Sequence, residues 1–114
     1  VWSEGNVYLG GAKAWSKEVN GLEIAGDRSD VKVELIEKDG QYYLDTNVYE
    51  LMKDFKSRMI NTEGLGKAFE PEQYFENPDG TPIRFDRDYF GSHRGVDVIP
   101  GPFANADDAK KKIK

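Results

Sequence analysis

Two aspartates two positions apart, Asp86 and Asp88, have the spacing in this 114-residue sequence that best suits chemistry. If the segment "TPIRFDRDYFG" (residues 81–91) is a β-strand, its alternate side chains project from one face at about 7 Å spacing. Two carboxylates at that separation can share a cation, and calcium prefers such oxygen ligands. They can also serve as the acid and base pair of a glycoside hydrolase. The spacing therefore admits a calcium site or a small hydrolase.

Three nearby arginines favour a structural role for the same aspartates. Arg84, Arg87 and Arg94 lie within or just after this segment, and a guanidinium pairs with a carboxylate through two parallel hydrogen bonds. We therefore expect ion pairs that hold a loop in shape, and we assign no catalytic residue. The preceding run "NPDG" (residues 77–80) predicts a tight turn and lacks the ligand pattern of an EF-hand calcium loop.

Other nucleophiles and metal ligands are scarce. The sequence has no cysteine, and its only histidine, His93, stands between two glycines in an expected loop. A zinc site needs several such ligands, and a lone histidine has no evident nucleophile to activate. We expect no cofactor, with calcium at Asp86 and Asp88 as the alternative.

Aromatic rings are the remaining candidates for ligand binding, because they can stack on sugar rings while charged neighbours bind the hydroxyl groups. A small β domain also needs aromatic side chains in its core. Trp15 and Tyr43 are the stronger candidates, since they fall in a loop or off the expected apolar face. The candidate ligand-binding residues are Trp15, Tyr43, Tyr74, Asp86, Asp88, Tyr89 and Arg94.

Composition narrows the class of protein. The net charge is -5 and the basic residues cluster only at positions 110–114, which disfavours nucleic acid as a partner. No apolar run approaches the roughly 20 residues of a membrane span. The length suits a single domain, residues 1–114. Because the chain begins with valine, we expect a piece of a larger protein.

The elements that must position these residues are mostly short strands. Two alternating runs meet at Asp39-Gly40, which predicts a hairpin with a two-residue turn in which Lys38 faces Gln41 and Leu35 faces Leu44. In that register two acids, Glu34 and Asp45, oppose each other. Like charges opposed on a sheet are unfavourable. A nearby lysine, Lys32 or Lys38, is expected to neutralise them in preference to a metal ion.

The rest of the chain predicts further strands and one helix. Short strands are expected near Val7 and Leu22, a strand that bends near Gly64 is expected in "SRMINTEGLGKAF" (residues 57–69), and residues 81–91 alternate as noted above. The run "NVYELMKDFKSRM" has helical spacing, which predicts a helix over about residues 48–56 with Asn47 as its N-cap. The fold class is therefore mainly β: an antiparallel sandwich, of jelly-roll or immunoglobulin-like type, with seven or eight strands and one short helix.

Four stretches carry a resemblance to a known group: "NVYLGGAKAW", "DGQYYLDTNV", "FENPDGTPIRFDRDYFGSHR" and "IPGPFA". Together they resemble the β-sandwich domains that accompany right-handed parallel β-helix proteins of the glycoside hydrolase and polysaccharide lyase kind. The resemblance implies secretion or a periplasmic, cell-envelope location. It also implies a non-catalytic accessory module that docks on the catalytic domain of its parent chain or contributes a loop that contacts an oligosaccharide. It transfers no catalytic residue.

Two other functions remain open on the sequence. The chain could be a stand-alone glycan-binding domain, which would bind oligosaccharides in isolation. It could also be a small glycoside hydrolase that uses Asp86 and Asp88, in which case the isolated chain would turn over its substrate.

Overall fold

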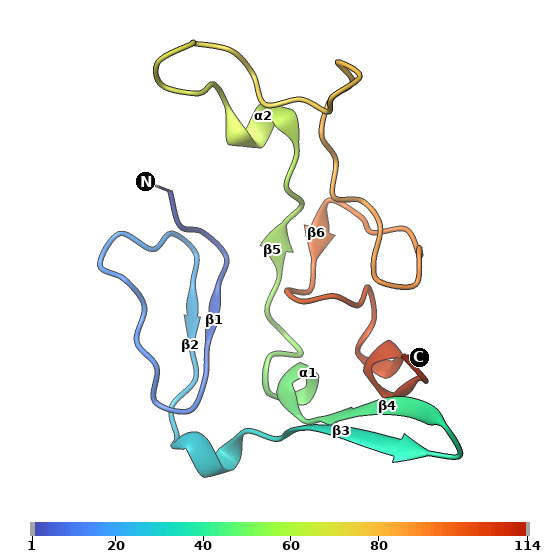
Figure 1. Cartoon of the computed structure of the whole chain (residues 1–114). Helices are drawn as coiled ribbons and strands as arrows, with labels where there is room; N and C mark the ends of the chain where they lie inside the picture. The colour runs from blue at the N-terminus through green and yellow to red at the C-terminus, as the bar shows by residue number, and fades with distance from the viewer. Residues whose placement is uncertain (1, 114) are drawn as a thin grey trace.

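The hairpin at Asp39-Gly40 forms the base of the molecule as drawn in Figure 1. In the computed structural model, which describes residues 2–113, β3 (Val33–Lys38) pairs antiparallel with β4 (Gln41–Thr46) in the predicted register. Both turn residues have positive φ, 53° for Asp39 and 72° for Gly40, as a type I′ turn requires. The prediction of this hairpin is confirmed.

The other strands are only two residues long and also pair in twos. β1 (Val7–Tyr8) and β2 (Leu22–Glu23) are parallel, whereas β5 (Ser57–Arg58) and β6 (Asp97–Val98) are antiparallel. Residues 2–113 thus contain six strands in three two-stranded sheets, where the sequence predicted seven or eight. A β-rich chain with short helices is confirmed, but the finer prediction of a two-sheet sandwich is not.

The helix predicted over residues 48–56 is a single turn, α1 (Val48–Leu51). It ends early because residues 52–54 form a turn, in which the amide of Phe55 donates to the carbonyl of Met52 at 2.9 Å. Asn47 occupies the N-cap position as predicted, but its side chain makes no cap hydrogen bond. It accepts instead from the amide of Lys32 and donates to the carbonyl of Asp30, and so fastens the start of the hairpin.

The bending strand predicted after residue 57 is replaced by a second one-turn helix. β5 stops at Arg58, and α2 (Thr62–Leu65) begins after Asn61, whose side chain accepts a hydrogen bond from the amide of Gly64 at 2.7 Å. This N-cap stabilises a helical turn. Two 3₁₀ helices complete the regular structure, η1 (Arg28–Asp30) and η2 (Ala106–Lys110). No helix within residues 2–113 is long and apolar enough to cross a membrane.

Residues 81–91, predicted as a strand from their alternation, form an irregular path with isolated bridges. The amide of Phe85 donates to Ile60, that of Tyr89 to Pro102, and that of Asp88 to Ser92. A strand needs a continuous partner, and here each backbone group finds a different one. The alternation of residue types was therefore a misleading signal.

The core lies where α1 meets the end of the chain. Its buried members are Tyr49, Met52, Phe103 and Ala109, and partly buried side chains from β1, β2 and β4 pack around them. The ring of Phe103 contacts that of Tyr49 at a centroid distance of 5.7 Å, and the Tyr49 hydroxyl accepts a hydrogen bond from the Phe103 amide. The apolar side chains of β3, by contrast, remain exposed.

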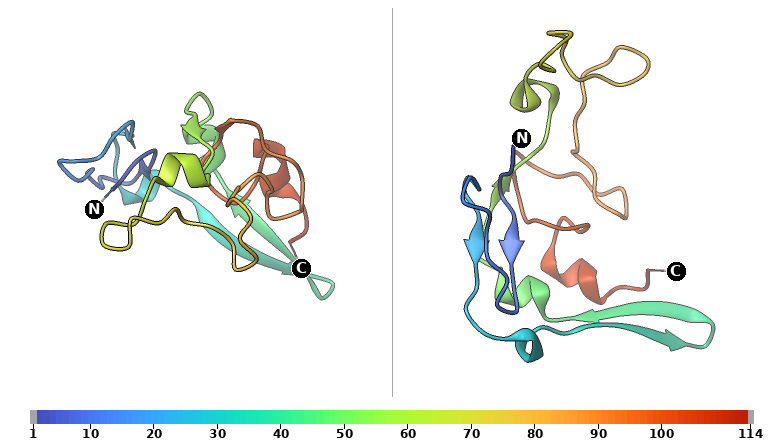
Figure 2. Two further views of the ribbon diagram at one scale, coloured as in Figure 1. Left: turned by 90° about the horizontal axis from the view of Figure 1, so that it is seen from above. Right: turned by 60° about the vertical axis from the view of Figure 1, so that its left-hand side comes forward.

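The fold is open, as Figure 2 shows from two further sides: the loops of residues 66–90 and the β3–β4 hairpin extend away from this core. The radius of gyration is 16.5 Å, compared with about 13 Å for a compact domain of this length. The accessible surface is 8331 Å², compared with about 6,300 Å² for a compact monomer of this mass. The chain therefore exposes roughly 2,000 Å² more than its size requires.

Candidate functional site

The Asp88 carboxylate is engaged by the backbone. Its Oδ1 atom accepts hydrogen bonds from the amides of Phe90 (2.9 Å) and Ser92 (2.7 Å), and Oδ2 accepts one from Ala104 (2.9 Å). The amide of Ala104, followed by those of Ser92 and Phe90, lowers the pKa of Asp88 below its ordinary value, because these bonds favour the charged carboxylate. Asp88 therefore organises a loop, and both of its carboxylate oxygens accept hydrogen bonds from the backbone.

Arg94 also fixes backbone. Its Nη2 atom donates to the carbonyl oxygens of Gly101 (2.5 Å) and Phe103 (2.9 Å), and its amide donates to the carbonyl of Asp86 at 2.8 Å. Its Nε atom is buried and has no hydrogen-bond partner among residues 2–113. A buried donor without an acceptor lowers the stability of the fold. Arg94 is therefore the side chain of this network that has a hydrogen-bond donor without a partner.

Asp86 and Tyr89 contact different partners. The Asp86 carboxylate lies 3.8 Å from the Arg84 guanidinium, and the Tyr89 hydroxyl donates to the carbonyl of Ile113 at 2.8 Å. Across residues 2–113, no group of three or more His, Cys, Asp or Glu side chains is arranged to hold a metal ion. Of the expected ion pairs with arginine, the structure shows one for Asp86, with Arg84, whereas Asp88 is held by backbone amides. A role for either aspartate in binding calcium or sugar stays a prediction.

The three other aromatic candidates lie on separate segments (Figure 1). Trp15 is in the connection from β1 to β2, 43% exposed, with the Lys17 ammonium 5.6 Å from the centre of its ring. Tyr43 is in β4 and its hydroxyl donates to the side chain of Gln41. Tyr74 follows α2, is exposed, and has the Lys67 ammonium 5.1 Å from its ring centre. The structure does not gather these rings into one surface.

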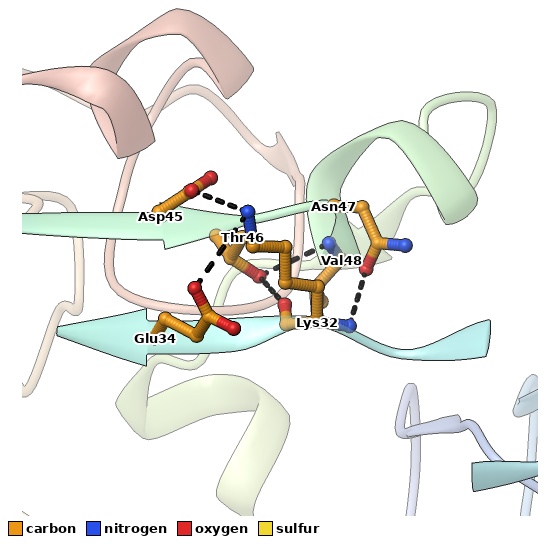
Figure 3. Close-up of polar contacts among 6 residues, drawn as sticks. All are labelled: Lys32, Glu34, Asp45, Thr46, Asn47 and Val48. Atoms are coloured by element: carbon orange, nitrogen blue, oxygen red, sulfur yellow. Dashed lines mark hydrogen bonds and ion pairs between the residues drawn. The ribbon is translucent and has the colours of Figure 1, made fainter. Parts of the chain in front are cut away.

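The opposed acids on the hairpin are neutralised as predicted (Figure 3). Glu34 faces Asp45 across the strand pair, and the Lys32 ammonium lies 3.7 Å from the Glu34 carboxylate and 2.5 Å from that of Asp45. The Thr46 hydroxyl donates to the carbonyl of Lys32 on the same side of the hairpin. A lysine therefore occupies the place that a cation would need.

A pocket that the sequence did not predict lies between residues 2–6 and β5. It has a volume of about 520 Å³, and its lining includes Trp2, Glu4, Arg58, Phe85 and Arg94. This volume falls within the range of small-molecule sites, about 300–1,000 Å³. It is the largest described pocket that combines exposed aromatic rings with charged side chains.

An ion pair organises the centre of this lining. The Arg58 guanidinium meets the Glu4 carboxylate twice, Nε to Oε1 at 2.8 Å and Nη2 to Oε2 at 2.8 Å. The Glu4 side chain is only 14% exposed. The guanidinium carbon of Arg58 also lies 5.3 Å from the centre of the Trp2 ring, within the range of a cation–π contact.

The wall formed by residues 2–6 is held in place by the carboxylate of Glu18. Glu18 accepts hydrogen bonds from the Ser3 hydroxyl, the Tyr8 hydroxyl, and both the amide and the side chain of Asn6. These donors, with Ser3 first, lower the pKa of Glu18. Gly5 allows the wall to approach β5, since a Cβ atom on Gly5 would lie 1.9 Å from the Ser57 hydroxyl oxygen.

Sequence reasoning missed this pocket because its walls are far apart along the chain. Glu4 and Arg58 are 54 positions apart, and neither belongs to a recognisable motif. Arg94 was the only pocket residue among the candidates. The one available signal was Trp2 and Glu4, an aromatic ring and a carboxylate two positions apart near the start of the sequence, and a pattern this short is not diagnostic.

The fold and the pocket define a small β-rich unit with one organised cleft. Neither a family model nor a curated protein sequence matches the chain. Among solved structures it is similar to XylC, described as "The complex structure of XylC with xylose", with a TM-score of 0.72 and 24% identity. The match covers 89% of this chain and 16% of XylC, so the chain spans about one sixth of that protein's length. The chain and the matched part of XylC share a fold.

Proposed function

We propose that the chain is a non-catalytic accessory module of an extracellular or cell-envelope carbohydrate-active protein and that it packs against a larger domain of the same polypeptide. The observation that carries this proposal is the match to one sixth of XylC, a protein whose structure was solved with xylose bound. The resemblance of the sequence to modules of β-helix enzymes supports the same context, and we take the larger domain to be such a β-helix. A two-sheet sandwich would then be completed by contacts that residues 2–113 do not supply alone.

The open shape of the chain supports docking. The excess of roughly 2,000 Å² of exposed surface is more than the about 800 Å² that one partner buries in a standard protein interface. Large apolar side chains lie on that surface, and the most exposed are Phe69, Val96, Val33 and Leu35. Val33 and Leu35 are two positions apart on β3 and share one face of it, and exposed apolar residues that are contiguous in this way mark interaction surfaces.

β3 offers the most extended docking edge. All six of its residues are exposed, and its only strand partner among residues 2–113 is β4. An unpaired strand edge presents free N–H and C=O groups and is normally covered or paired in a complete protein. We therefore place β3 at the contact with the larger domain.

Hydrogen–deuterium exchange of the isolated chain and of the full gene product tests the proposal. We expect β3 amides and the segment around Phe69 to exchange more slowly in the full product. Identical exchange in both samples would contradict docking and favour the stand-alone glycan-binding domain. A panel of aryl glycosides is the parallel assay: turnover by the isolated chain that Asp88→Asn abolishes with folding intact would favour the hydrolase.

A further inference from the structure

We infer that the pocket between residues 2–6 and β5 binds one or two units of a neutral saccharide, with Trp2 as the stacking ring and the Glu4–Arg58 pair as the group that binds hydroxyls. The choice of saccharide as the ligand class rests on the proposed carbohydrate context. The location and the polarity of the site rest on the geometry alone.

The aromatic lining suits the apolar face of a sugar ring. Trp2 is 48% exposed and Phe85 is 60% exposed, and both line the pocket. Aromatic rings that stay exposed inside a concave site leave apolar surface in contact with water, which is unfavourable. A ligand that covers the rings removes this surface from water. A saccharide would cover a ring with its C–H face while its hydroxyl groups remain free for polar partners.

The ion pair supplies those partners. Binding to Glu4 uses one N–H of Nε and one of Nη2 on Arg58, so three of the five guanidinium N–H groups remain available. Each carboxylate oxygen of Glu4 keeps a lone pair that can accept a hydroxyl hydrogen. A hydrogen-bond donor and an acceptor therefore lie next to each other. This suits a sugar hydroxyl, which can donate one hydrogen bond and accept another.

The charges of the pocket favour a neutral ligand. Glu4 cancels the charge of Arg58, and the Nη2 atom of Arg94 donates to the carbonyl oxygens of Gly101 and Phe103. An acidic sugar would approach the Glu4 carboxylate, and the two guanidinium groups of the lining are already bonded, Arg58 to Glu4 and Arg94 to backbone carbonyls.

The lining is also ordered before any ligand arrives. Glu18 holds Ser3 and Asn6, and Glu4 holds Arg58 by two bonds. A site whose side chains are already fixed loses less conformational entropy on binding. This distinguishes the pocket from the exposed rings of Trp15 and Tyr74, each of which has a lysine ammonium near its face.

Titration of the 114-residue chain with xylobiose, cellobiose and glucuronic acid, followed by amide resonances, tests the inference. We expect saturable shifts for residues 3–6 and 57–60 with a neutral disaccharide. Xylobiose is the expected ligand, and binding of cellobiose in its place would still support a neutral-saccharide pocket. No saturable shift with either disaccharide, or tighter binding of glucuronic acid, would overturn the inference.

Two tryptophans form a matched pair for this experiment, since both are about half exposed and both carry a cation near the ring. Trp2→Ala should weaken binding by about tenfold or more, whereas Trp15→Ala should leave it unchanged. Arg58→Lys keeps the charge but loses the two-bond contact, and it should weaken binding while the amide spectrum shows a folded chain. Equal loss in Trp2→Ala and Trp15→Ala would place the site elsewhere.

Because docking is measured by exchange and not by sugar binding, failure of this inference is distinguishable from failure of the proposed function.

Discussion

The Oδ2 atom of Asp88 accepts a hydrogen bond from the amide of Ala104 at 2.9 Å, and this bond joins two segments 16 positions apart. The other carboxylate oxygen closes the turn after Asp88 through the amides of Phe90 and Ser92. One side chain therefore shapes the charged loop and attaches it to the chain that leads into η2. The loop has a structural reason for its aspartate that requires no catalysis.

Asp88→Asn should destabilise the chain at neutral pH, because an amide has one acceptor oxygen where the carboxylate has two. The amide of Ala104, followed by those of Ser92 and Phe90, lowers the pKa of Asp88 in the folded chain. This group therefore stabilises the fold above the unfolded pKa of about 3.9, and its contribution is lost as the pH falls through the lower folded value. Urea unfolding should show a lower midpoint for Asp88→Asn at pH 7 and a much smaller difference from the wild type near pH 2.

Asp86→Asn is the control for this experiment, since among residues 2–113 its carboxylate has one ion-pair partner, the Arg84 side chain at 3.8 Å. It should change the midpoint little. An equal loss for Asp88→Asn at both pH values would show that the charge of Asp88 is not what holds the loop.

Gly5→Ala should destabilise the wall of the pocket for two separable reasons: the positive φ of Gly5 and the overlap of a Cβ atom with Ser57. The φ of Gly5 is +70°, and a Cβ atom there would lie 1.9 Å from the Ser57 hydroxyl oxygen and 2.9 Å from the Ser57 Cβ. Gly40→Ala is the matched control, because Gly40 has a φ of +72° and open space around it. The control should cost about 1–2 kcal/mol and Gly5→Ala clearly more. In a Ser57→Gly background the two costs should converge, as measured by chemical unfolding; if they stay apart, the overlap with Ser57 is not the cause.

The sequence predicted well those features that depend on neighbours. The hairpin needs only a two-residue turn with positive φ and alternating strands on either side, and the register, the opposed acids and the neutralising lysine all follow from it. Residues 81–91 show the limit of the same reasoning. Their side chains alternate as in a strand, but a strand also needs one partner, and the backbone partners here are scattered over Ile60, Ser92 and Pro102.

Side chains that bond to distant backbone also escaped prediction. Asn47 has the right type and position for a helix cap, yet its amide group is used by Asp30 and Lys32 at the start of the hairpin. The pocket is a stronger case, because Glu4 and Arg58 meet only after the first sheet packs beside β5. Neither residue has a neighbour in sequence that would identify it.

Phe103→Ala should remove a large part of the stability of the isolated chain. Phe103 is 2% exposed, stacks on Phe90 at a centroid distance of 5.5 Å and contacts the edge of Tyr89 at 6.1 Å. Truncating a buried phenylalanine costs about 3–5 kcal/mol, and the core here is small. Phe69→Ala is the matched control, since Phe69 is 96% exposed and its truncation should change the free energy of unfolding by less than about 0.5 kcal/mol. Similar losses for the two variants, measured by urea unfolding, would mean that the core does not lie around Phe103.

Lys32→Met tests whether one lysine makes the opposed acids of the hairpin tolerable. Glu34 and Asp45 face each other, and the hydrogen bond to Asp45, supported by the charges of both acids, raises the pKa of Lys32. The ammonium group therefore stabilises the fold below its unfolded pKa of about 10.4, and that contribution disappears as the pH rises through the higher folded value. At neutral pH, Lys32→Met should lower the unfolding midpoint, and the loss should shrink in high salt, which screens exposed charges.

A second substitution separates repulsion from lost packing in the same hairpin. Glu34→Gln removes one of the two like charges, so it should recover stability in the Lys32→Met background while changing the wild type little or for the worse. Lys38→Met is the control for loss of a lysine elsewhere on β3, because Lys38 faces the neutral Gln41 beside the turn. If Glu34→Gln has the same effect with and without Lys32, the two carboxylates do not repel each other through the gap that Lys32 fills. The lysine would then act on Asp45 alone, which is the acid it contacts at 2.5 Å.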